Sequence, residues 1–282
     1  MDIRINGNMA DITLETERTV GDILSGLDAW LTGSGHSISG LRVDGDLITA
    51  ELFTGVFDRD LDTIGSLDIL TSPRPVLTLE ALYTARQTCE ALQEAAFNEQ
   101  GQVRTVWAAN AASAFLSAEA PDIADSISRT LQGEGLPAKQ LCVLIDERIR
   151  EIINPPLEIQ NMDALVSGLI QRLEDLPLDI QTGKDGRAAE TVSLFSTIAE
   201  KLFRLLRQLK SQGETENLPA QDFLEEFGTA LKELLAAYEA KDSVLIGDLA
   251  EYELAPRLGS FYTALKAAAA HIPAALSTDA TL

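Results

Sequence analysis

The residues whose types and spacing could do chemistry lie late in the chain, in the stretch GDLAEYELAPRL. Asp248 and Glu251 are one helical turn apart, Tyr252 follows directly, and Glu253 lies further round the helix. Carboxylates grouped in this way can bind a divalent ion or transfer protons. Sites of that kind in helical bundles usually draw carboxylates from several helices, and no histidine is near. The stretch therefore predicts either a solvated acidic face or a small-ligand or enzyme site on Asp248, Glu251 and Tyr252.

A second group of residues with chemical potential is basic. Lys201, Arg204, Arg207 and Lys210 lie along one predicted helix, with Glu200 as the acidic residue among them. The chain as a whole has 44 acidic and 22 basic residues and a net charge of −22, so this dense positive cluster stands out. It predicts either a solvated face near the negative end of the helix dipole, or a docking site for an acidic surface, including that of the chain's own N-terminal module.

The glycine-rich stretch LTGSGHSISGLRVDGDLI, residues 31–48, raises the question of a phosphate-binding loop. Such a loop needs glycines after a strand and before a helix, so that backbone N–H groups at the helix N-terminus point at the anion. Here a helical run comes first, then the glycines, then an alternating run. The stretch is therefore interpreted as a helix end and a turn, and His36 is expected in an exposed loop.

Other signatures of catalysis and metal binding are missing from the sequence. It has two histidines, and it has no HExxH, paired CxxC, P-loop, GxSxG or EF-hand pattern. Cys89 and Cys142 lie far apart in helix-like runs and are predicted to be small buried apolar residues, not a disulfide or a metal pair. We therefore expect no catalytic residues, no cofactor and no metal site.

The charge also restricts the partners. Binding to nucleic acid or to an anionic membrane needs a basic face, so a net charge of −22 argues against both. The acidity is compatible with a basic protein partner, or it keeps the protein in solution. No run approaches eighteen apolar residues, and the first residues lack a signal-peptide pattern, so a cytoplasmic location is expected.

Residues 1–72 contain short alternating runs around one helical run. They hold thirteen acidic residues, four arginines and no lysine, a net charge of −9. DIRIN and ADITLE flank a turn signal and predict a hairpin, and Asp44–Gly45 predicts a second one. Between them, Thr19 is predicted to cap a helix with Asp22 in its first turn. The apolar stripe of that helix consists of Val20, Ile23, Leu24, Leu27, Trp30 and Leu31.

This order of elements, with a helix entered at TVGDIL and a closing strand SLDIL, resembles the ubiquitin-like β-grasp fold over the first quarter of the chain. The resemblance implies a mixed sheet whose first and last strands pair in parallel at the centre, crossed by the helix on one face. It would bury Trp30 and its stripe against Ile3, Ile5, Leu41, Val43 and Ile69. Carriers of this fold act through a free C-terminal diglycine, which does not follow the last strand here. The implied use is a small, rigid binding module.

The rest of the sequence is predicted to be helical, so the fold class is α+β. The domains expected are a β-grasp module over 1–72, a proline-containing linker over 73–76, a bundle-like helical domain over 77–272 and a flexible tail over 273–282. The predicted helices are Leu77–Asn98, Val103–Ala118, Ile123–Leu131, Ala138–Ile153, Met162–Leu173, Ala188–Gln212, Ala220–Ala240 and Ser243–Ala270. Stretches such as NPP and DLPLDIQTGKDG are predicted to separate them, and Pro256 to kink or break the last one.

The most apolar helix carries a short heptad-like seam of Phe195, Ile198, Leu202, Leu205 and Leu209. It predicts a central bundle helix or the seam of a homodimer. Three functions therefore stay open. The chain is a non-catalytic interaction protein (an adaptor, an assembly factor or a chaperone-like protein), a small-ligand binder or enzyme, or a self-associating structural protein. The stretch around Tyr252 is also similar to C-terminal segments of uncharacterised bacterial proteins.

Overall fold

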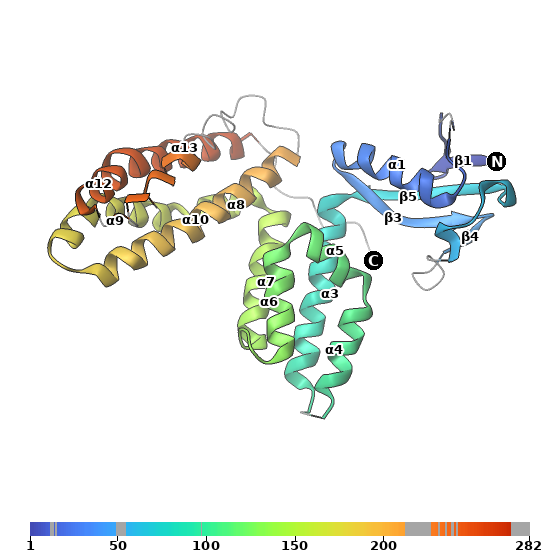
Figure 1. Ribbon diagram of the computed structural model, residues 1–282, viewed down its shortest axis with the longest axis horizontal. Coiled ribbons are helices and arrows are strands. Elements are labelled where there is room, and N and C mark those ends of the chain that lie inside the picture. Colours follow the sequence, from blue (N-terminus) through green and yellow to red (C-terminus); the bar gives the residue numbers. More distant parts are fainter. Residues whose placement is uncertain are drawn as a thin grey trace. The chain divides into compact units, whose positions relative to one another are not determined.

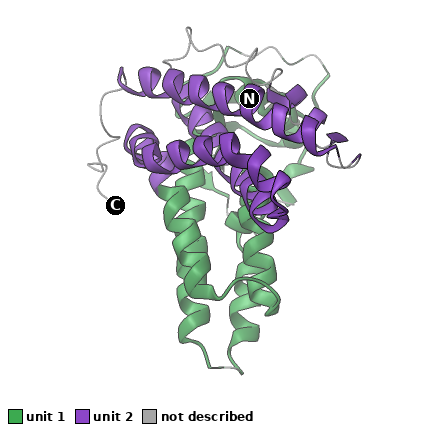
Figure 2. Cartoon of the chain, turned by 90° about the vertical axis from the view of Figure 1, so that its left-hand side faces the viewer, with its two compact units in different colours: residues 1–149 green, residues 150–282 purple. Residues whose placement is uncertain are grey.

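The computed structural model describes residues 1–11, 14, 16–48, 55–96, 98–211, 227–230, 232–234, 236–237, 240 and 242–271. They form an α+β protein with an N-terminal five-stranded sheet and a helical remainder. The chain divides into two compact units, residues 1–149 and 150–282 (Figure 2). The boundary expected from the sequence near residues 72–77 thus lies inside the first unit, and the predicted tail 273–282 lies outside the described residues.

The sheet consists of β1 (Asp2–Ile5), β2 (Asn8–Met9), β3 (His36–Val43), β4 (Asp46–Leu47) and β5 (Ser66–Pro73). Their order is β2-β1-β5-β3-β4, and β1 pairs with β5 in parallel while the other pairs are antiparallel (Figure 1). The hairpin predicted at Asp44–Gly45 is confirmed by the pairing of β3 with β4. The first predicted hairpin also forms, but its second strand is Asn8–Met9 and not ADITLE, of which residues 12, 13 and 15 lie outside the described residues.

The hairpin turns show why these sequences reverse the chain. Asn6 and Gly7 have φ values of 49° and 79°, and Asp44 and Gly45 have 54° and 95°. Two consecutive residues with positive φ match the twist of the flanking strands, and Asn, Asp and Gly adopt this conformation most readily.

Helix α1 (Val20–Gly33) begins at the predicted cap. The backbone N–H of Asp22 donates to Thr19 Oγ1 over 3.2 Å, and the N–H of Thr19 donates back to Asp22 Oδ2 over 2.9 Å. This reciprocal capping box satisfies two N–H groups that a helix start otherwise leaves without partners. The helix then crosses one face of the sheet (Figure 1), where Val20 and Leu24 are buried with β-strand residues in one core.

The end of α1 also agrees with the interpretation of the glycine-rich stretch as a helix end and a turn. The helix stops at Gly33, Gly35 has a φ of 75°, and β3 begins directly afterwards. His36, however, is not in a loop as expected. It is the first residue of β3, opposite Pro73 of β5, and is half-buried.

The resemblance implied that Trp30 is buried with the rest of its stripe. This is wrong, because Trp30 is 65% exposed. Leu24 and Leu31, seven residues apart, face the sheet with exposures of 4% and 3%. Trp30 is one residue before Leu31 and so lies about 100° round the helix from it. On that side the outermost strand is β2, which has two residues and does not cover the ring.

The first unit continues with a 3-10 turn, η1 (Leu61–Thr63), and then with helices. These are α3 (Arg74–Glu94), α4 (Gln100–Ala109), α5 (Ala111–Glu119), α6 (Pro121–Gln132) and α7 (Ala138–Ile153), whose last turn lies in the second unit. Strand β5 passes directly into α3, so the residues expected as a linker are the strand end and the first helical turn. Pro75 fits there because the first helical N–H groups need no partner.

One predicted helix of this part is two helices in the structure. Asn110 separates α4 from α5, and its side chain accepts a hydrogen bond from the N–H of Ala112 over 2.9 Å. This cap by the Asn110 side chain competes with continuation of α4 through residue 110. The apolar spacing of the sequence did not indicate the break.

The second unit contains α8 (Pro155–Asn161), α9 (Asp163–Gln181), α10 (Asp185–Ser211), α12 (Ser243–Asp248), the π-helical segment η2 (Leu249–Leu254) and α13 (Ala255–Ala269). The predicted break at NPP is confirmed, because α7 ends at Ile153 and Asn154 is not helical. Asn154 caps the short helix α8, which was not predicted and has a proline in its first turn. The break predicted over DLPLDIQTGKDG begins later than expected. Helix α9 continues through Pro177 to Gln181, and Pro177 packs closely on Gly247 of α12, so tertiary packing compensates for the lost backbone bond.

The interruption predicted at Pro256 takes the form of the π-helical turn η2. The proline lies in the first turn of α13, directly after the wider turn. A π turn changes the backbone hydrogen-bond spacing, and local widening of this kind accommodates residues that a regular helix interior rejects.

The predicted central helix α10 is confirmed as part of the core of the second unit. Its seam residues Phe195, Ile198, Leu202, Leu205 and Leu209 are all at most 4% exposed. Helix 220–240 of the prediction lies largely outside the described residues, but its Phe227 stacks on Phe195 with ring centroids 5.1 Å apart. A homodimer built on this seam would have to open the core of the unit. Among the described residues, every helix is too short or too polar to cross a membrane.

The two cysteines, expected to be unrelated, face each other in the first unit. Cys89 on α3 is buried, Cys142 on α7 is half-buried, and both are free thiols. Burial, together with the neighbouring Cys142, raises the pKa of Cys89 to about 12. Burial also raises the pKa of Cys142, whose sulfur accepts a hydrogen bond from Gln93 over 3.3 Å.

We therefore expect the two thiols to react at very different rates. A thiol-specific reagent at pH 8 should label Cys142 first, because Cys89 is buried and forms almost no thiolate there. Mass spectrometry of peptides from timed quenches measures both rates. In the Cys142→Ser variant, labelling should become slow until denaturant is added. Equal rates for the two thiols in the folded protein would contradict the burial of Cys89.

Candidate functional site

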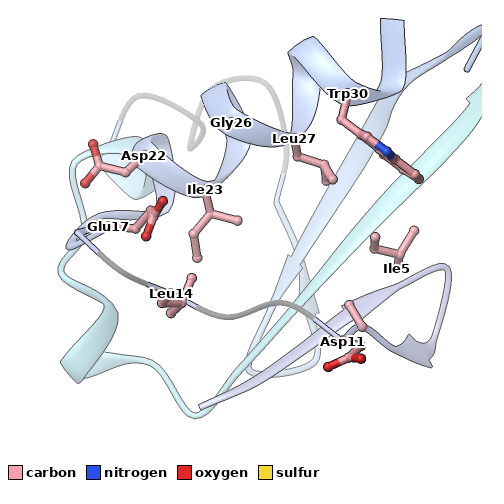
Figure 3. A pocket seen from close by; sticks show the side chains of 10 residues that line it. Ile5, Asp11, Leu14, Glu17, Asp22, Ile23, Gly26, Leu27 and Trp30 are labelled. Carbon is pink, nitrogen blue, oxygen red and sulfur yellow. The ribbon is translucent and has the colours of Figure 1, made fainter. Parts of the chain in front are cut away.

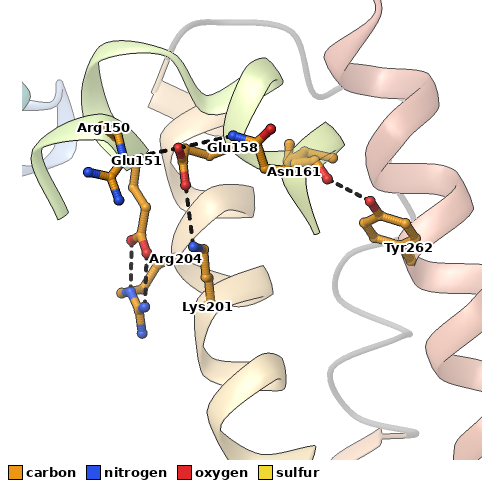
Figure 4. Close-up of polar contacts among 8 residues, drawn as sticks. Arg150, Glu151, Glu158, Asn161, Lys201, Arg204 and Tyr262 are labelled. Carbon is orange, nitrogen blue, oxygen red and sulfur yellow. Dashed lines mark hydrogen bonds and ion pairs between the residues drawn. The ribbon is translucent and has the colours of Figure 1, made fainter. Parts of the chain in front are cut away.

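The predicted basic cluster divides into two pairs in the structure. Lys201 and Arg204 reach buried carboxylates of the same unit (Figure 4). Arg204 binds Glu151 through two hydrogen bonds of 2.9 and 3.0 Å, and Lys201 Nζ lies 3.3 Å from Glu158 Oε2. Arg207 and Lys210 are exposed. Half of the cluster therefore belongs to the packing of the second unit.

These ion pairs tie α10 to α7 and α8. Glu151 and Glu158 are 2% and 5% exposed, and Arg150 also approaches Glu158, with 3.3 Å between Nε and Oε1. A buried carboxylate without a partner is costly, whereas one with a forked guanidinium partner is satisfied. The sequence did not indicate these acidic partners, because Glu158 lies 43 residues before Lys201 and Glu151 lies 53 residues before Arg204.

The same end of the unit carries a buried tyrosine. The hydroxyl of Tyr262 on α13 donates to the carbonyl oxygen of Ile159 on α8 over 2.6 Å (Figure 4). Burial raises the pKa of Tyr262, so the phenol stays neutral and keeps this bond. Helices α8, α10 and α13 are thus joined by specific polar contacts in addition to their apolar core.

Substitutions in the basic cluster should separate packing from surface roles. Arg204→Ala leaves Glu151 buried without its forked partner, so we expect the free energy of unfolding to fall by about 3–5 kcal/mol. Arg207→Ala, the matched change on the exposed face of the same helix, should cost less than about 0.5 kcal/mol. Urea unfolding followed by circular dichroism measures both. Equal losses of unfolding free energy in the two variants would show that the Arg204–Glu151 pair stabilises the protein no more than an exposed arginine does.

The acidic group near the chain's end faces solvent. Asp248 is exposed at the end of α12, and Tyr252 of η2 is 65% exposed. A hydrogen bond to Glu251 and the charges of Glu251 and Asp248 raise the pKa of Tyr252. Glu253 instead pairs with Arg257, 2.6 Å away. In the described part of the chain, no three His, Cys, Asp or Glu side chains gather as a metal ion would require.

Residues 1–73, which form the sheet and α1, are called the N-terminal domain below. A groove in this domain is a further candidate, which the sequence did not indicate. It has a volume of about 530 Å³ and lies between α1 and the residues Asp11, Leu14 and Glu17 (Figure 3). Its lining combines apolar side chains with three carboxylates, and consists of Ile5, Ala10, Asp11, Leu14, Glu17, Asp22, Ile23, Gly26, Leu27 and Trp30.

Helix α1 supplies one wall of this groove through its periodicity. Ile23, Leu27 and Trp30 occupy positions i, i+4 and i+7, so they line up along one side of the helix. Gly26 lies on the same side, and a Cβ there would meet no atom within 4 Å, so the missing side chain leaves the wall open. Figure 3 shows Leu14 and Ile5 on the opposite side of the groove.

The groove is apolar in the middle and acidic at its ends. Glu17 and Asp22 lie at one end and Asp11 at the other (Figure 3). Hydrogen bonds from the backbone N–H groups of Arg18 and Thr19 lower the pKa of Asp22, so this carboxylate stays charged at neutral pH. Its capping role fixes its position at the start of α1.

Large apolar side chains remain accessible at the groove. Trp30 is 65% exposed and Leu14 37%. Clustered exposed apolar residues on a folded domain typically mark an interaction site. Tryptophan is among the residues that contribute most to protein interfaces. The arrangement is therefore suited to binding another chain rather than only to packing within its own domain.

Comparison with known proteins finds matches to two separate parts of the chain. Residues 1–73 match the family described as TP0873 N-terminal domain, and residues 158–264 match a domain of unknown function, DUF8042. An uncharacterized protein of Treponema pallidum (strain Nichols) is 22% identical over 261 residues, which cover 91% of this chain and 92% of the relative. No solved structure matches the chain. The N-terminal match ends with β5, and the second match lies within the second unit.

Proposed function

We propose that this chain is a non-catalytic protein-interaction protein, acting as an adaptor, assembly factor or chaperone-like protein, and that it binds a partner protein in the groove beside α1. The observation that carries the proposal is the 65% exposure of Trp30 at an apolar groove with acidic ends. The lining offers apolar contact area and fixed charge, which are the elements of recognition. Its carboxylate Asp22 is already engaged in capping the helix.

We also propose that the N-terminal domain is a ubiquitin-like β-grasp module. The strand order β2-β1-β5-β3-β4, the parallel central pair and the single helix across one face support this assignment. Such a module is a rigid platform, which favours binding because little conformational entropy is lost on association. A cytoplasmic location is part of the proposal, since two free thiols are typical of a reducing compartment.

The exposed face around Asp248, Glu251 and Tyr252 is the second candidate surface. Tyr252 is 65% exposed, as Trp30 is, and an accessible aromatic ring beside carboxylates can also contribute to an interface. The two aromatic residues lie in different units of the chain, so substituting each one tests the two surfaces separately.

Truncation of the two aromatic side chains should distinguish the surfaces. We expect Trp30→Ala to reduce partner capture from the native host by about tenfold or more, as for a central interface tryptophan. Tyr252→Ala should leave capture unchanged. Quantitative mass spectrometry of proteins retained by the tagged full-length chain measures this, and thermal unfolding confirms that both variants are folded.

If Tyr252→Ala reduces capture and Trp30→Ala does not, the binding surface lies on the second unit. Retention of every stoichiometric partner by both variants would contradict the proposed role of the groove. If Trp30→Ala loses capture but also lowers the melting temperature strongly, unfolding could explain the loss. Trp30→Lys then distinguishes the two causes, because an exposed position tolerates a charged residue in the folded protein while an interface does not.

A further inference from the structure

We infer that the groove beside α1 binds a segment of a partner protein whose middle is apolar and whose two ends carry Lys or Arg. The inference rests on the proposed function and names the chemistry of the partner. It follows from the order of groups along the groove, which places carboxylates at both ends and apolar side chains between them.

The middle of the groove accepts apolar side chains. Ile23 and Leu27 form the wall on α1, and Leu14 lies opposite (Figure 3). A volume of about 530 Å³ is within the range of about 300–1,000 Å³ found for sites that bury a ligand. Inserted side chains would cover Leu14 and Trp30, and burial of such surface stabilises a complex by roughly 25 cal/mol per Å² before the costs of association.

The ends of the groove select the charge of the flanks. Glu17 and Asp22 lie at one end, and Asp11 at the other. The domain has no lysine and a net charge of −9 over residues 1–72, so the surrounding field reinforces these carboxylates. An acidic segment would be repelled, whereas Lys or Arg side chains would be attracted and could pair with them.

The side chains of two arginines of this domain contact groups outside the groove. Arg4 has Asp2 as a partner at 3.5 Å, and Arg59 donates to Thr63 and lies 3.8 Å from Asp44. Both pairings turn these cations toward acidic or polar groups that do not line the groove. Arg18 is adjacent to Glu17 in sequence and is exposed, and the carbonyl of Arg59 accepts from the N–H of Val20, so both residues lie near the acidic end.

Trp30 adds a preference for a cation at the end that holds Asp11. Its indole ring projects over that end, on the side of Ile5 (Figure 3). A Lys or Arg side chain that reaches the ring face would be attracted by the electron-rich indole. The same ring offers apolar area to the middle of the segment.

Two matched peptides test the inference with the full-length chain. Both are labelled and share one apolar core, and they carry either Lys or Glu at both ends. By fluorescence anisotropy at low salt, we expect the Lys-flanked peptide to bind at least about tenfold more tightly. The difference should shrink at about 1 M salt, where the screening length is only about 3 Å.

Variants show whether the groove is responsible. Asp11→Asn combined with Glu17→Gln should weaken binding of the Lys-flanked peptide at least about threefold, and Trp30→Ala should weaken binding of both peptides. The control is Asp46→Asn combined with Glu134→Gln, which changes the net charge equally at two exposed residues that do not line the groove. This control should leave the affinities within about twofold, because distant exposed charges are screened.

Three outcomes would overturn the inference. One is equal affinity for the two peptides, another is no binding of the Lys-flanked peptide, and the third is equal weakening by the groove and control variants. If partner capture still depends on Trp30 in any of these cases, the proposed function stands and only the charge of the partner is wrong. If capture is also independent of Trp30, both ideas fail.

Discussion

The parallel pairing of β1 with β5 is the constraint on which the N-terminal domain depends. It joins residues 2–5 to residues 66–69, the two ends of the domain's sequence, at the centre of one sheet. Side chains reinforce it, since Asn6 bonds to the backbone and hydroxyl of Thr71 and Asp68 accepts from the N–H of Gly7. Once these strands are central, β2 and β4 become the edges and α1 has one face to cover.

The groove is a consequence of that geometry. Helix α1 covers the middle of the sheet, while β2 contains only two residues, so the side of the helix facing this edge remains open. Ile23 is 5% exposed and belongs to the core, and Leu27 packs against that core, whereas Trp30 is 65% exposed. The open side of the helix thus begins at the edge of the core, and the acidic cap of the helix lies at the end of the same surface.

The second unit depends on buried ion pairs as well as on its apolar core. Its apolar core is large, yet α7, α8 and α10 also meet through Glu151 and Glu158, which are almost fully buried with Arg204 and Lys201 as partners. Buried ion pairs add little net stability but disfavour any arrangement that separates the charges. They therefore favour one register of these helices over alternatives that the apolar seam alone would allow.

The sequence by itself determined the features that depend on neighbours within a turn or a hairpin. These are the two hairpins, the Thr19–Asp22 cap, the end of α1 at the glycines and most of the helices, including the apolar seam of α10. Local backbone preferences and side-chain periodicity are sufficient there. The tertiary structure alone decided the exposure of Trp30, the partners of Lys201 and Arg204, the meeting of Cys89 with Cys142 and the passage of α9 through Pro177. Each of these depends on which distant element packs alongside, and hydrophobic spacing specifies that a face is apolar but not what covers it.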